Sequence, residues 1–341
     1  MQHCTAASTS WPLLATTAEA DALTNFTGLV GCTHLDLSQT PLGEEGAHAL
    51  ATLLGQAAVH SNLVHVNLSS TSLGATGGKK VLKALVEAQK LESLDLSFNW
   101  LGDVLGDHLI ARLNQLLRQA KKLRVLHLRW NDIPSTAWNV LGRSIASTKT
   151  LEVLDLGGNY LRNKGAVRLA YAVRGHPGLR TLRLDHTGTG SAGAQAFAAV
   201  LRNKSTALAH LDLSGNEIAD GGAIMLAGAL KWPKTRLNFL SLRLQERITD
   251  TGAISFAEAL RLNSQLATLD LGGNQITRAG AEALFGAWSS SRSLSALLLD
   301  DNGSVRRHGW ALPLGKNLPA NLTRLMRGTR QHPHRGGGSS R

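Results

Sequence analysis

The chain has 341 residues, 43% of them hydrophobic, and a formal net charge of +12. No stretch approaches the run of about 18 apolar residues that a membrane-spanning helix needs. The charge is uneven, because residues 1–78 contain no lysine or arginine, whereas residues 302–341 contain eight basic residues and no acidic one. Composition therefore excludes a membrane-spanning chain and favours an anionic partner near the C-terminus.

The first residues and the cysteines bear on the cellular compartment. Residues 1–24 lack the charged start and long apolar run of a secretion signal, and they lack the arginines of a mitochondrial transit peptide. Cys4 and Cys32 are the only cysteines, too few for a disulfide framework and typical of a reducing compartment. We predict a cytoplasmic protein, with a mitochondrial location or a place in a large ribonucleoprotein assembly as alternatives.

Four segments are expected along the chain. Residues 1–30 are predicted to form an N-terminal helical cap, with a helix over 12–28, and residues 31–305 a repeat solenoid. Residues 306–330 place apolar side chains on one helical face, which predicts a C-terminal cap. Residues 331–341 are predicted to be a disordered basic tail.

A short motif recurs ten times within the solenoid segment, at intervals of 28 to 32 residues. It reads LDLSFN at Leu94 and LDLGGN at Leu154. The pattern L-x-L-x-x-N in a unit of this length is typical of leucine-rich repeats with a full helix in every repeat. The units begin at Leu35, Val66, Leu94, Leu126, Leu154, Leu182, Leu211, Leu240, Leu269 and Leu297.

The periodicity within each unit predicts a strand followed by a helix. Leu94 and Leu96 alternate with polar residues, as in a strand with one face toward a core. The segments 165–175 and 193–203 place small and apolar residues at helical spacing. Because one unit cannot bury its own apolar face, neighbouring units must stack. We predict an α/β leucine-rich-repeat horseshoe of about ten repeats, with a parallel β-sheet on the concave face and α-helices on the convex face.

Over roughly residues 24–305 the units resemble the ribonuclease-inhibitor-like subfamily of leucine-rich-repeat proteins. The resemblance implies that two repeat classes alternate, and every odd unit here has an aspartate between its strand leucines while no even unit does. It also implies that the asparagine after each strand bonds to the turn and forms a ladder between repeats. The ladder is expected to be weaker where this asparagine is replaced, at Thr40, Thr71, Thr187 and Gln245.

Aromatic residues are concentrated in the turns after the third, fourth and fifth strands. Adjacent strands lie about 4.8 Å apart, so these side chains can form one patch. Trp, Tyr and Arg dominate the hot spots of protein interfaces, which favours a binding role, although packing into the local turns is an alternative. The predicted partner-binding residues of these turns are Phe98, Trp100, Arg129, Trp130, Tyr160 and Arg162.

The outward-facing strand positions give a second set of candidates on the concave face. Asp95, His127, Asp155 and Arg183 occupy these positions in consecutive units and are predicted to contact the same partner. The recurring carboxylates can attract a basic partner. Alternatively they are a family residue that basic neighbours such as Arg183 neutralise.

The sequence predicts neither catalysis nor a cofactor. It lacks the motifs of nucleotide-binding, serine-hydrolase and zinc-hydrolase sites. His34 and His65 fall in one outward column near Asp36, a set that can bind zinc, but no cysteine joins them and we predict no metal.

The basic C-terminal segment is a candidate site for an anionic partner such as RNA. A cluster of cations there would neutralise phosphates in a salt-dependent, sequence-independent way, and a solubilising tail is the alternative. The residues are Arg306, Arg307, Lys316, Arg324, Arg327, Arg330 and Arg335.

We therefore expect a non-enzymatic scaffold, a monomer or a subunit of a larger complex, that binds a protein partner through its concave face. The first alternative is a structural component of a ribonucleoprotein, such as a lineage-specific ribosomal or mitoribosomal protein, that uses the basic C-terminus. The second is a regulator of a small GTPase, because proteins similar to the Ran GTPase activator share this repeat. That family ends in an acidic tail, whereas this chain ends in a basic one.

Overall fold

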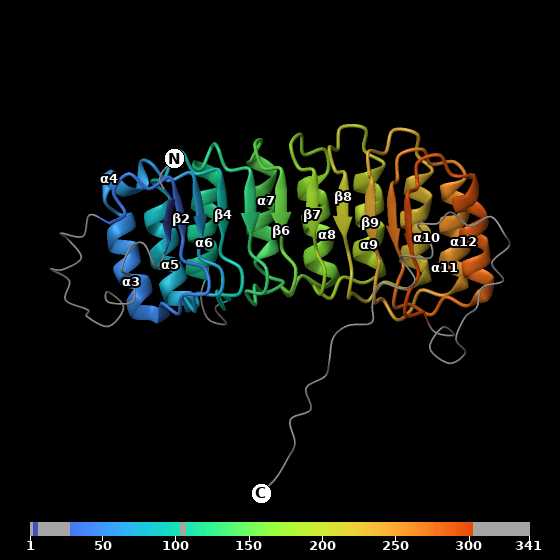
Figure 1. The fold of residues 1–341 in the computed structure, drawn as a ribbon, viewed down its shortest axis with the longest axis horizontal. Helices are drawn as coiled ribbons and strands as arrows, with labels where there is room; N and C mark the ends of the chain where they lie inside the picture. The colour runs from blue at the N-terminus through green and yellow to red at the C-terminus, as the bar shows by residue number, and fades with distance from the viewer. Residues whose placement is uncertain (1–2, 6–27, 103–106, 303–341) are drawn as a thin grey trace, which may run out of the picture.

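The computed structural model describes residues 3–5, 28–102 and 107–302, which form one open sheet of eleven parallel strands in sequence order (Figure 1). Ten of the strands begin or centre on the predicted leucine positions. The strands are β1 (His3–Thr5), β2 (His34–Asp36), β3 (His65–Asn67), β4 (Ser93–Asp95), β5 (Val125–His127), β6 (Val153–Asp155), β7 (Thr181–Arg183), β8 (His210–Asp212), β9 (Phe239–Ser241), β10 (Thr268–Asp270) and β11 (Ala296–Leu298).

Helices cover one face of this sheet along its whole length, as Figure 1 shows, so the chain is the predicted α/β horseshoe. The small residues at the helix starts allow neighbouring helices to approach closely: a Cβ at Gly193 would lie only 2.9 Å from the Cβ of Ala166. The helices are α3 (Gly43–Leu54), α4 (Ala57–His60), α5 (Gly74–Leu85), α6 (Asp107–Gln119), α7 (Trp138–Ser147), α8 (Arg162–Val173), α9 (Ser191–Leu201), α10 (Asp220–Leu230), α11 (Asp250–Leu260) and α12 (Arg278–Ser290).

The hydrophobic core runs continuously between sheet and helices. Leu94 and Leu96 are fully buried, as the strand alternation predicts, and the largest buried side chains are Trp138, Phe197 and Phe256 from the helices. Each repeat contributes only part of this core, so its stability depends on the neighbouring repeats. None of the helices in the described ranges has the length and apolarity that a membrane crossing requires.

A ladder of buried asparagines joins the turns that follow the strands, as expected. Asn159 is representative: its Oδ1 accepts from the backbone N–H groups of Asn131 (3.2 Å) and Ile133 (3.0 Å). Its Nδ2 donates to the carbonyls of Leu128 (2.8 Å) and Leu156 (2.9 Å). One side chain thus satisfies four backbone groups from two repeats, groups that would otherwise be buried without partners.

The replacements in the ladder behave in two ways. In the described part of the chain the hydroxyl of Thr71 bonds within its own repeat and to Asn99 of the next one, but not to the preceding repeat, so the ladder is weaker there as predicted. The prediction is wrong for Gln245. Its longer side chain reaches back to the Leu213 carbonyl (2.6 Å) and accepts from the Ile218 N–H (3.0 Å), which correspond to two of the bonds that Asn159 makes with its preceding repeat.

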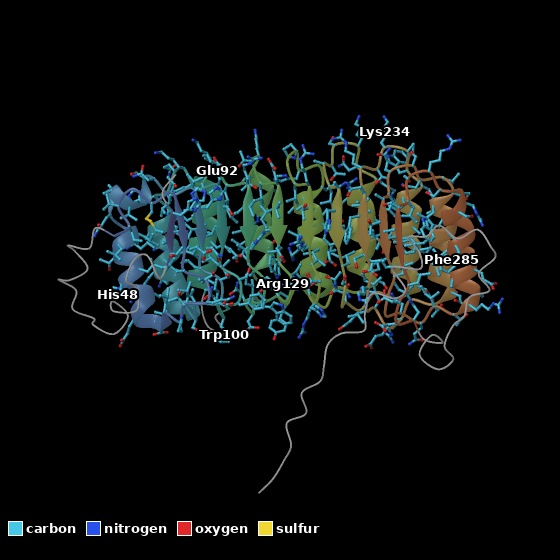
Figure 2. The ribbon with its side chains drawn as sticks, viewed as in Figure 1. His48, Glu92, Trp100, Arg129, Lys234 and Phe285 are labelled. Atoms are coloured by element: carbon cyan, nitrogen blue, oxygen red, sulfur yellow. A yellow bond between two sulfur atoms is a disulfide. The ribbon has the colours of Figure 1, made fainter. Side chains whose placement is uncertain are left out.

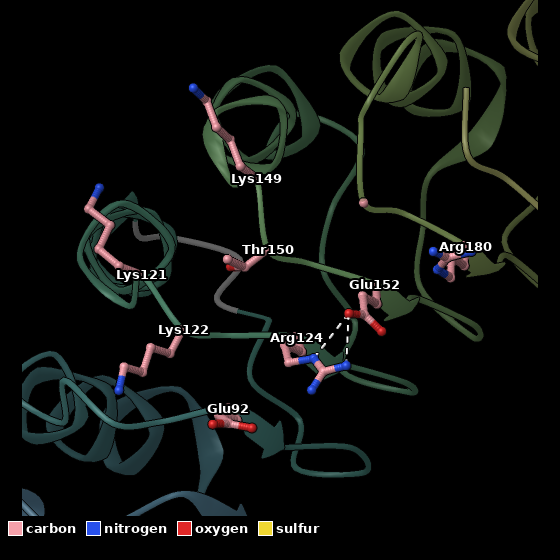
Figure 3. A pocket seen from close by; sticks show the side chains of 9 residues that line it. Glu92, Lys121, Lys122, Arg124, Lys149, Thr150, Glu152 and Arg180 are labelled. Carbon is pink, nitrogen blue, oxygen red and sulfur yellow. Dashed lines mark hydrogen bonds and ion pairs between the residues drawn. The ribbon is translucent and has the colours of Figure 1, made fainter. Parts of the chain in front are cut away.

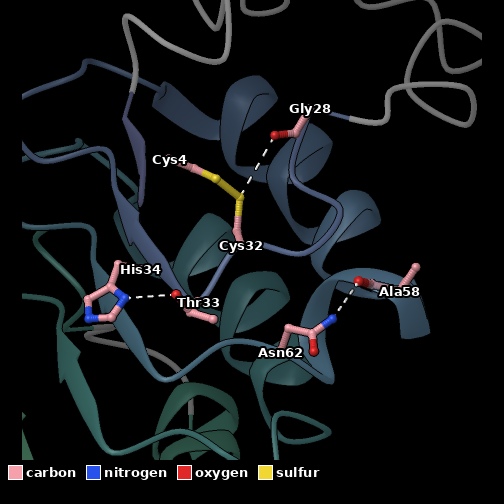
Figure 4. Close-up of a disulfide and its surroundings, with 7 residues drawn as sticks. All are labelled: Cys4, Gly28, Cys32, Thr33, His34, Ala58 and Asn62. Atoms are coloured by element: carbon pink, nitrogen blue, oxygen red, sulfur yellow. Dashed lines mark hydrogen bonds between the residues drawn. A yellow bond between two sulfur atoms is a disulfide. The ribbon is translucent and has the colours of Figure 1, made fainter. Parts of the chain in front are cut away.

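The N-terminus differs from what the sequence analysis expected. Residues His3–Thr5 add strand β1 to the sheet, and Cys4 pairs in register with Leu35, so it takes the inward position of a strand leucine. Cys4 and Cys32 form a disulfide (Figure 4), which the low cysteine count had not suggested. The expected cap helix over 12–28 falls almost entirely outside the described residues, as do the expected C-terminal cap and the basic tail.

Candidate functional site

The recurring aspartates of the concave face have a local structural role. The Oδ1 atom of Asp95 accepts from the N–H of Ser97 (2.8 Å), and Asp155 accepts in the same way from Gly157 (3.0 Å). Each carboxylate thereby satisfies a backbone donor where its strand ends. The same bond recurs at Asp36, Asp212 and Asp270.

Basic residues of the even repeats lie beside these carboxylates. His127 Nδ1 is 3.4 Å from Asp95 Oδ2, and Arg183 Nη1 is 3.7 Å from Asp155 Oδ2. Burial works against ionisation of Asp95, but the hydrogen bonds with His127 and Ser97 outweigh it and hold the pKa of Asp95 below its ordinary value. The carboxylates of Asp95 and Asp155 are therefore paired within the protein.

Arg129 makes the strongest of these pairs. Its guanidinium passes over Gly157 and binds the carboxylate of Asp185, two repeats further on, with Nη1 2.6 Å from Oδ1. A Cβ at Gly157 would lie 2.4 Å from that Nη1, so only glycine leaves room for the crossing. This hydrogen bond raises the pKa of Arg129, and the arginine ties three consecutive repeats together.

The same arrangement, an arginine that crosses a glycine to bind a carboxylate two repeats further on, occurs a second time four repeats later; we call it the arginine clamp. Arg243 passes over Gly272, where a Cβ would lie 2.3 Å from its Nη1, and its Nη2 binds Asp300 at 2.7 Å. Both arginines are therefore committed to intramolecular pairs.

The aromatic residues of the turns, in contrast, are exposed. The exposed fractions are 45% for Phe98, 64% for Trp100, 42% for Trp130 and 54% for Tyr160. The rings of Phe98 and Trp130 stack with centroids 6.5 Å apart, and His186 lies 6.1 Å beyond Trp130. We call Phe98, Trp100, Trp130, Tyr160 and His186 the aromatic ridge. It follows the edge of the sheet at the carboxyl ends of the strands, where Figure 2 labels Trp100 and Arg129.

The backbone beneath the ridge has a left-handed conformation. Phe98, Trp130 and His186 have φ values of 58°, 50° and 53°, and the equivalent positions in alternate repeats are glycines, Gly158 at 70° and Gly215 at 62°. In this region the conformational free energy of a residue with a Cβ is about 1 kcal/mol less favourable than that of glycine. Bulky residues therefore stand at positions where the backbone favours glycine.

The alternate glycines provide the room for these side chains. A Cβ at Gly158 would lie 2.3 Å from Trp130 Cδ2, and a Cβ at Gly215 would lie 2.3 Å from His186 Cε1. The Trp130 indole thus lies flat over Gly158, and the His186 imidazole lies flat over Gly215. The outer face of each ring is turned toward solvent. A glycine thus makes room for the bulky residue of the preceding repeat at Trp130 and at His186, whereas Phe98 is followed by Trp130, against which its ring stacks.

The comparisons with known proteins agree with this architecture. The Leucine Rich repeat family matches residues 87–104, 148–170, 204–227 and 263–285. A ribonuclease inhibitor from Sus scrofa is 33% identical over 257 residues, which are 74% of this chain and 54% of that protein, and the one from Mus musculus is 30% identical over 276 residues, 80% and 57%. The chain is a leucine-rich-repeat protein of the ribonuclease-inhibitor-like type.

Other relatives carry the same repeats in longer chains. NACHT, LRR and PYD domains-containing protein 14 from Mus musculus is 31% identical over 74% of this leucine-rich-repeat protein but only 25% of its own length. The chain spans about half the length of the ribonuclease inhibitors that it matches. The crystal structure of a TLR13-ssRNA13 complex matches 82% of this chain and 47% of its own at 18% identity, with a TM-score of 0.42, too low to bear on function.

The remaining candidates of this leucine-rich-repeat protein are placed as follows. Arg162 is exposed at the start of α8, beside Gly188 in the next turn. His34 and His65 stack with ring centroids 4.4 Å apart, and the described residues contain no cluster of three metal-ligating side chains. The seven C-terminal cations from Arg306 to Arg335 lie outside the described residues. His186 was missed by the sequence analysis, although it occupies the same turn position as Phe98 and Trp130.

Proposed function

We propose that this protein is a non-enzymatic interaction scaffold that binds a protein partner across its concave face and the aromatic ridge. Leucine-rich-repeat folds commonly mediate protein–protein interactions, and solenoid curvature offers an extended concave surface for them. The observation that carries the proposal is the ridge itself, because the rings of Phe98, Trp100 and Trp130 stay exposed at backbone positions that favour glycine. Strain of this kind persists where it serves a function.

The ridge has the chemistry of an interface centre. Trp and Tyr bury much area with few rotatable bonds, so they contribute a large share of binding free energy. Trp130 is held by stacking against its neighbours and lies over Gly158, so little side-chain freedom is left to lose on binding. The paired side chains of Asp95, His127, Asp155 and Arg183, with Arg129, would surround this centre as a polar border.

A triple variant tests the placement: Trp100→Ala, Trp130→Ala and Tyr160→Ala. Proteins recovered with the wild-type chain after affinity purification should be lost, while circular dichroism stays unchanged because the three side chains are exposed. The matched control is Tyr171→Ala, Ile224→Ala and Ile254→Ala, which removes three exposed apolar side chains from the helices and should retain the partner. Full recovery by the folded ridge variant would contradict the proposal.

The second candidate function is a structural role in a ribonucleoprotein, and the charge distribution favours it. Residues 302–341 contain eight basic residues and no acidic one, a composition suited to phosphate neutralisation. Nuclease treatment before the same purification separates the two functions: a protein partner stays bound, whereas a ribonucleoprotein assembly falls apart.

The cytoplasmic location is also a proposal, and the Cys4–Cys32 disulfide makes it testable. Disulfides persist in oxidising compartments and are rare in the cytosol. Alkylation of free thiols in intact cells, followed by mass spectrometry, should label both cysteines if the protein is cytosolic. Unlabelled, bonded cysteines would move the proposed location to an oxidising compartment.

A further inference from the structure

We propose that the edge of the sheet at the amino ends of the strands binds the phosphate backbone of a single-stranded nucleic acid. This edge lies opposite the aromatic ridge: Figure 2 labels Glu92 and Lys234 along one edge and Trp100 and Arg129 toward the other. The inference therefore does not rest on the proposed protein-binding function. It also does not depend on the basic C-terminal segment.

A shallow pocket of about 320 Å³ opens on this edge and crosses four consecutive repeats (Figure 3). Its lining comes from the turns that lead into β4, β5, β6 and β7, and its cations come from the last three of these turns. Five cations line it, all exposed, and we call them the cationic groove: Lys121, Lys122, Arg124, Lys149 and Arg180.

Most of the positive charge in the groove is unpaired. The Arg124 guanidinium binds Glu152 at 2.9 Å, and the other carboxylate of the lining is Glu92. Within the described ranges, Lys122, Lys149 and Arg180 form no ion pair with any carboxylate. Like charges gathered without partners repel one another and attract a polyanion.

Compensation of the helix dipoles does not explain Lys149 and Arg180, although Lys121 Nζ does donate to the Arg118 carbonyl in the last turn of α6 (2.5 Å). The favourable interaction between a cation and a helix C-terminus is confined to the last turn. Helices α7 and α8 end at Ser147 and Val173 and have no basic residue in their last turns. Lys149 and Arg180 lie beyond those ends, in the turns, so the groove presents them to solvent rather than to the helix carbonyls.

The continuation of the same edge favours nucleic acid over an acidic protein. In the turn after α10, Trp232 is 45% exposed and is flanked by the exposed cations Lys231, Lys234 and Arg236. Of these, Lys231 pairs with Glu258 at 3.1 Å. An exposed indole among cations offers a face on which a base can stack while the cations hold the backbone, as in proteins that bind single strands.

The test compares two triple variants of the full chain with equal loss of charge. The groove variant is Lys121→Gln, Lys122→Gln and Lys149→Gln. The control variant is Lys79→Gln, Lys80→Gln and Lys164→Gln. It removes two lysines from α5 and one from the first turn of α8, at the end of that helix away from the groove. Binding of a fluorescein-labelled, mixed-sequence single-stranded RNA is measured by fluorescence anisotropy over a range of salt concentrations.

The groove variant should bind at least about tenfold more weakly than wild type, and its slope of log K against log salt should be smaller by about 2, from three contacts of about 0.7 each. The control variant should match wild type. Trp232→Ala should also weaken binding about tenfold but leave the salt slope unchanged, because stacking releases no counterions. The aromatic-ridge variant should bind the RNA normally.

Three results would overturn the proposal. The first is equal weakening in the groove and control variants, which would mean that only total charge matters. The second is no measurable RNA binding by wild type at low salt. The third is preferential, groove-dependent binding of polyglutamate over RNA, which would assign the edge to an acidic protein instead.

Discussion

The two edges of the sheet are built from the same repeats but use their charges differently. At the carboxyl edge, Arg129 and Arg243 each cross a glycine to reach a carboxylate, and aspartates and asparagines satisfy the backbone of the turns. At the amino edge, Lys122, Lys149 and Arg180 have no ion-pair partner among the described residues. Paired charges hold the repeats together, whereas unpaired charges and exposed rings remain available to partners.

The largest effect is expected from the ladder at the carboxyl edge. Asn159→Ala should lower the free energy of unfolding by about 3 kcal/mol or more, because it leaves four buried backbone groups without partners at roughly 1 kcal/mol or more each. Urea denaturation measures this loss. Asn139→Ala, an exposed asparagine of α7, is the control and should cost less than about 0.5 kcal/mol. Equal losses would refute the structural role of the ladder.

A second pair of variants compares one ion pair from each edge. Arg129→Gln should destabilise the protein by about 2 kcal/mol, because the Asp185 carboxylate is buried and would lose its partner. Arg124→Gln breaks the exposed pair with Glu152 and should cost less than about 1 kcal/mol. Both values come from the same denaturation experiment. If the exposed pair proved the more stabilising, the distinction between the edges would be lost.

The smallest effect concerns acid stability, where two equivalent aspartates should act in opposite directions. The pKa of Asp95 is lowered, although burial opposes this, by bonds with His127 and Ser97, so its contribution is present above its ordinary pKa and is lost as the pH falls. The pKa of Asp270 is raised, mainly by burial, so its contribution is present in acid and is lost as the pH rises.

Asp95→Asn should therefore make the loss of stability in acid less steep, and Asp270→Asn should make it steeper. Denaturation midpoints measured from neutral pH down through the carboxylate range would show the difference. Identical pH profiles for the two variants would mean that the environments of these aspartates do not differ as described.

The repeat could be predicted from the sequence because its signal is local and occurs ten times. The strand leucines, the asparagine ladder and the small helix starts each follow from spacing within one unit. Strand β1 escaped this reasoning because His3–Thr5 contains no leucine pair, although it is as long as the other strands. Its identity as a strand depends on Cys4 taking a leucine position beside Leu35 and bonding to Cys32, which is a property of the assembled sheet.

The candidate site was predictable only in part, for the same reason. The exposed rings were found because the repeats align their turns, and the same alignment would have found His186. The Arg129 clamp joins residues 56 positions apart and depends on Gly157 between them, so it required coordinates. The cationic groove combines cations from the turns of three repeats. No single sequence motif contains all of them, so the groove could not be predicted from the sequence either.

The most direct test of the account is Trp130→Gly, measured for both partner binding and stability. Glycine removes the left-handed strain, so the free energy of unfolding should stay unchanged or rise by up to about 1 kcal/mol. The dissociation constant of the protein recovered with wild type should rise at least about tenfold. Leu244→Gly, at the equivalent left-handed position outside the ridge, should leave that constant unchanged. Unaltered binding by Trp130→Gly would contradict the claim that the ridge is held in place to bind a partner.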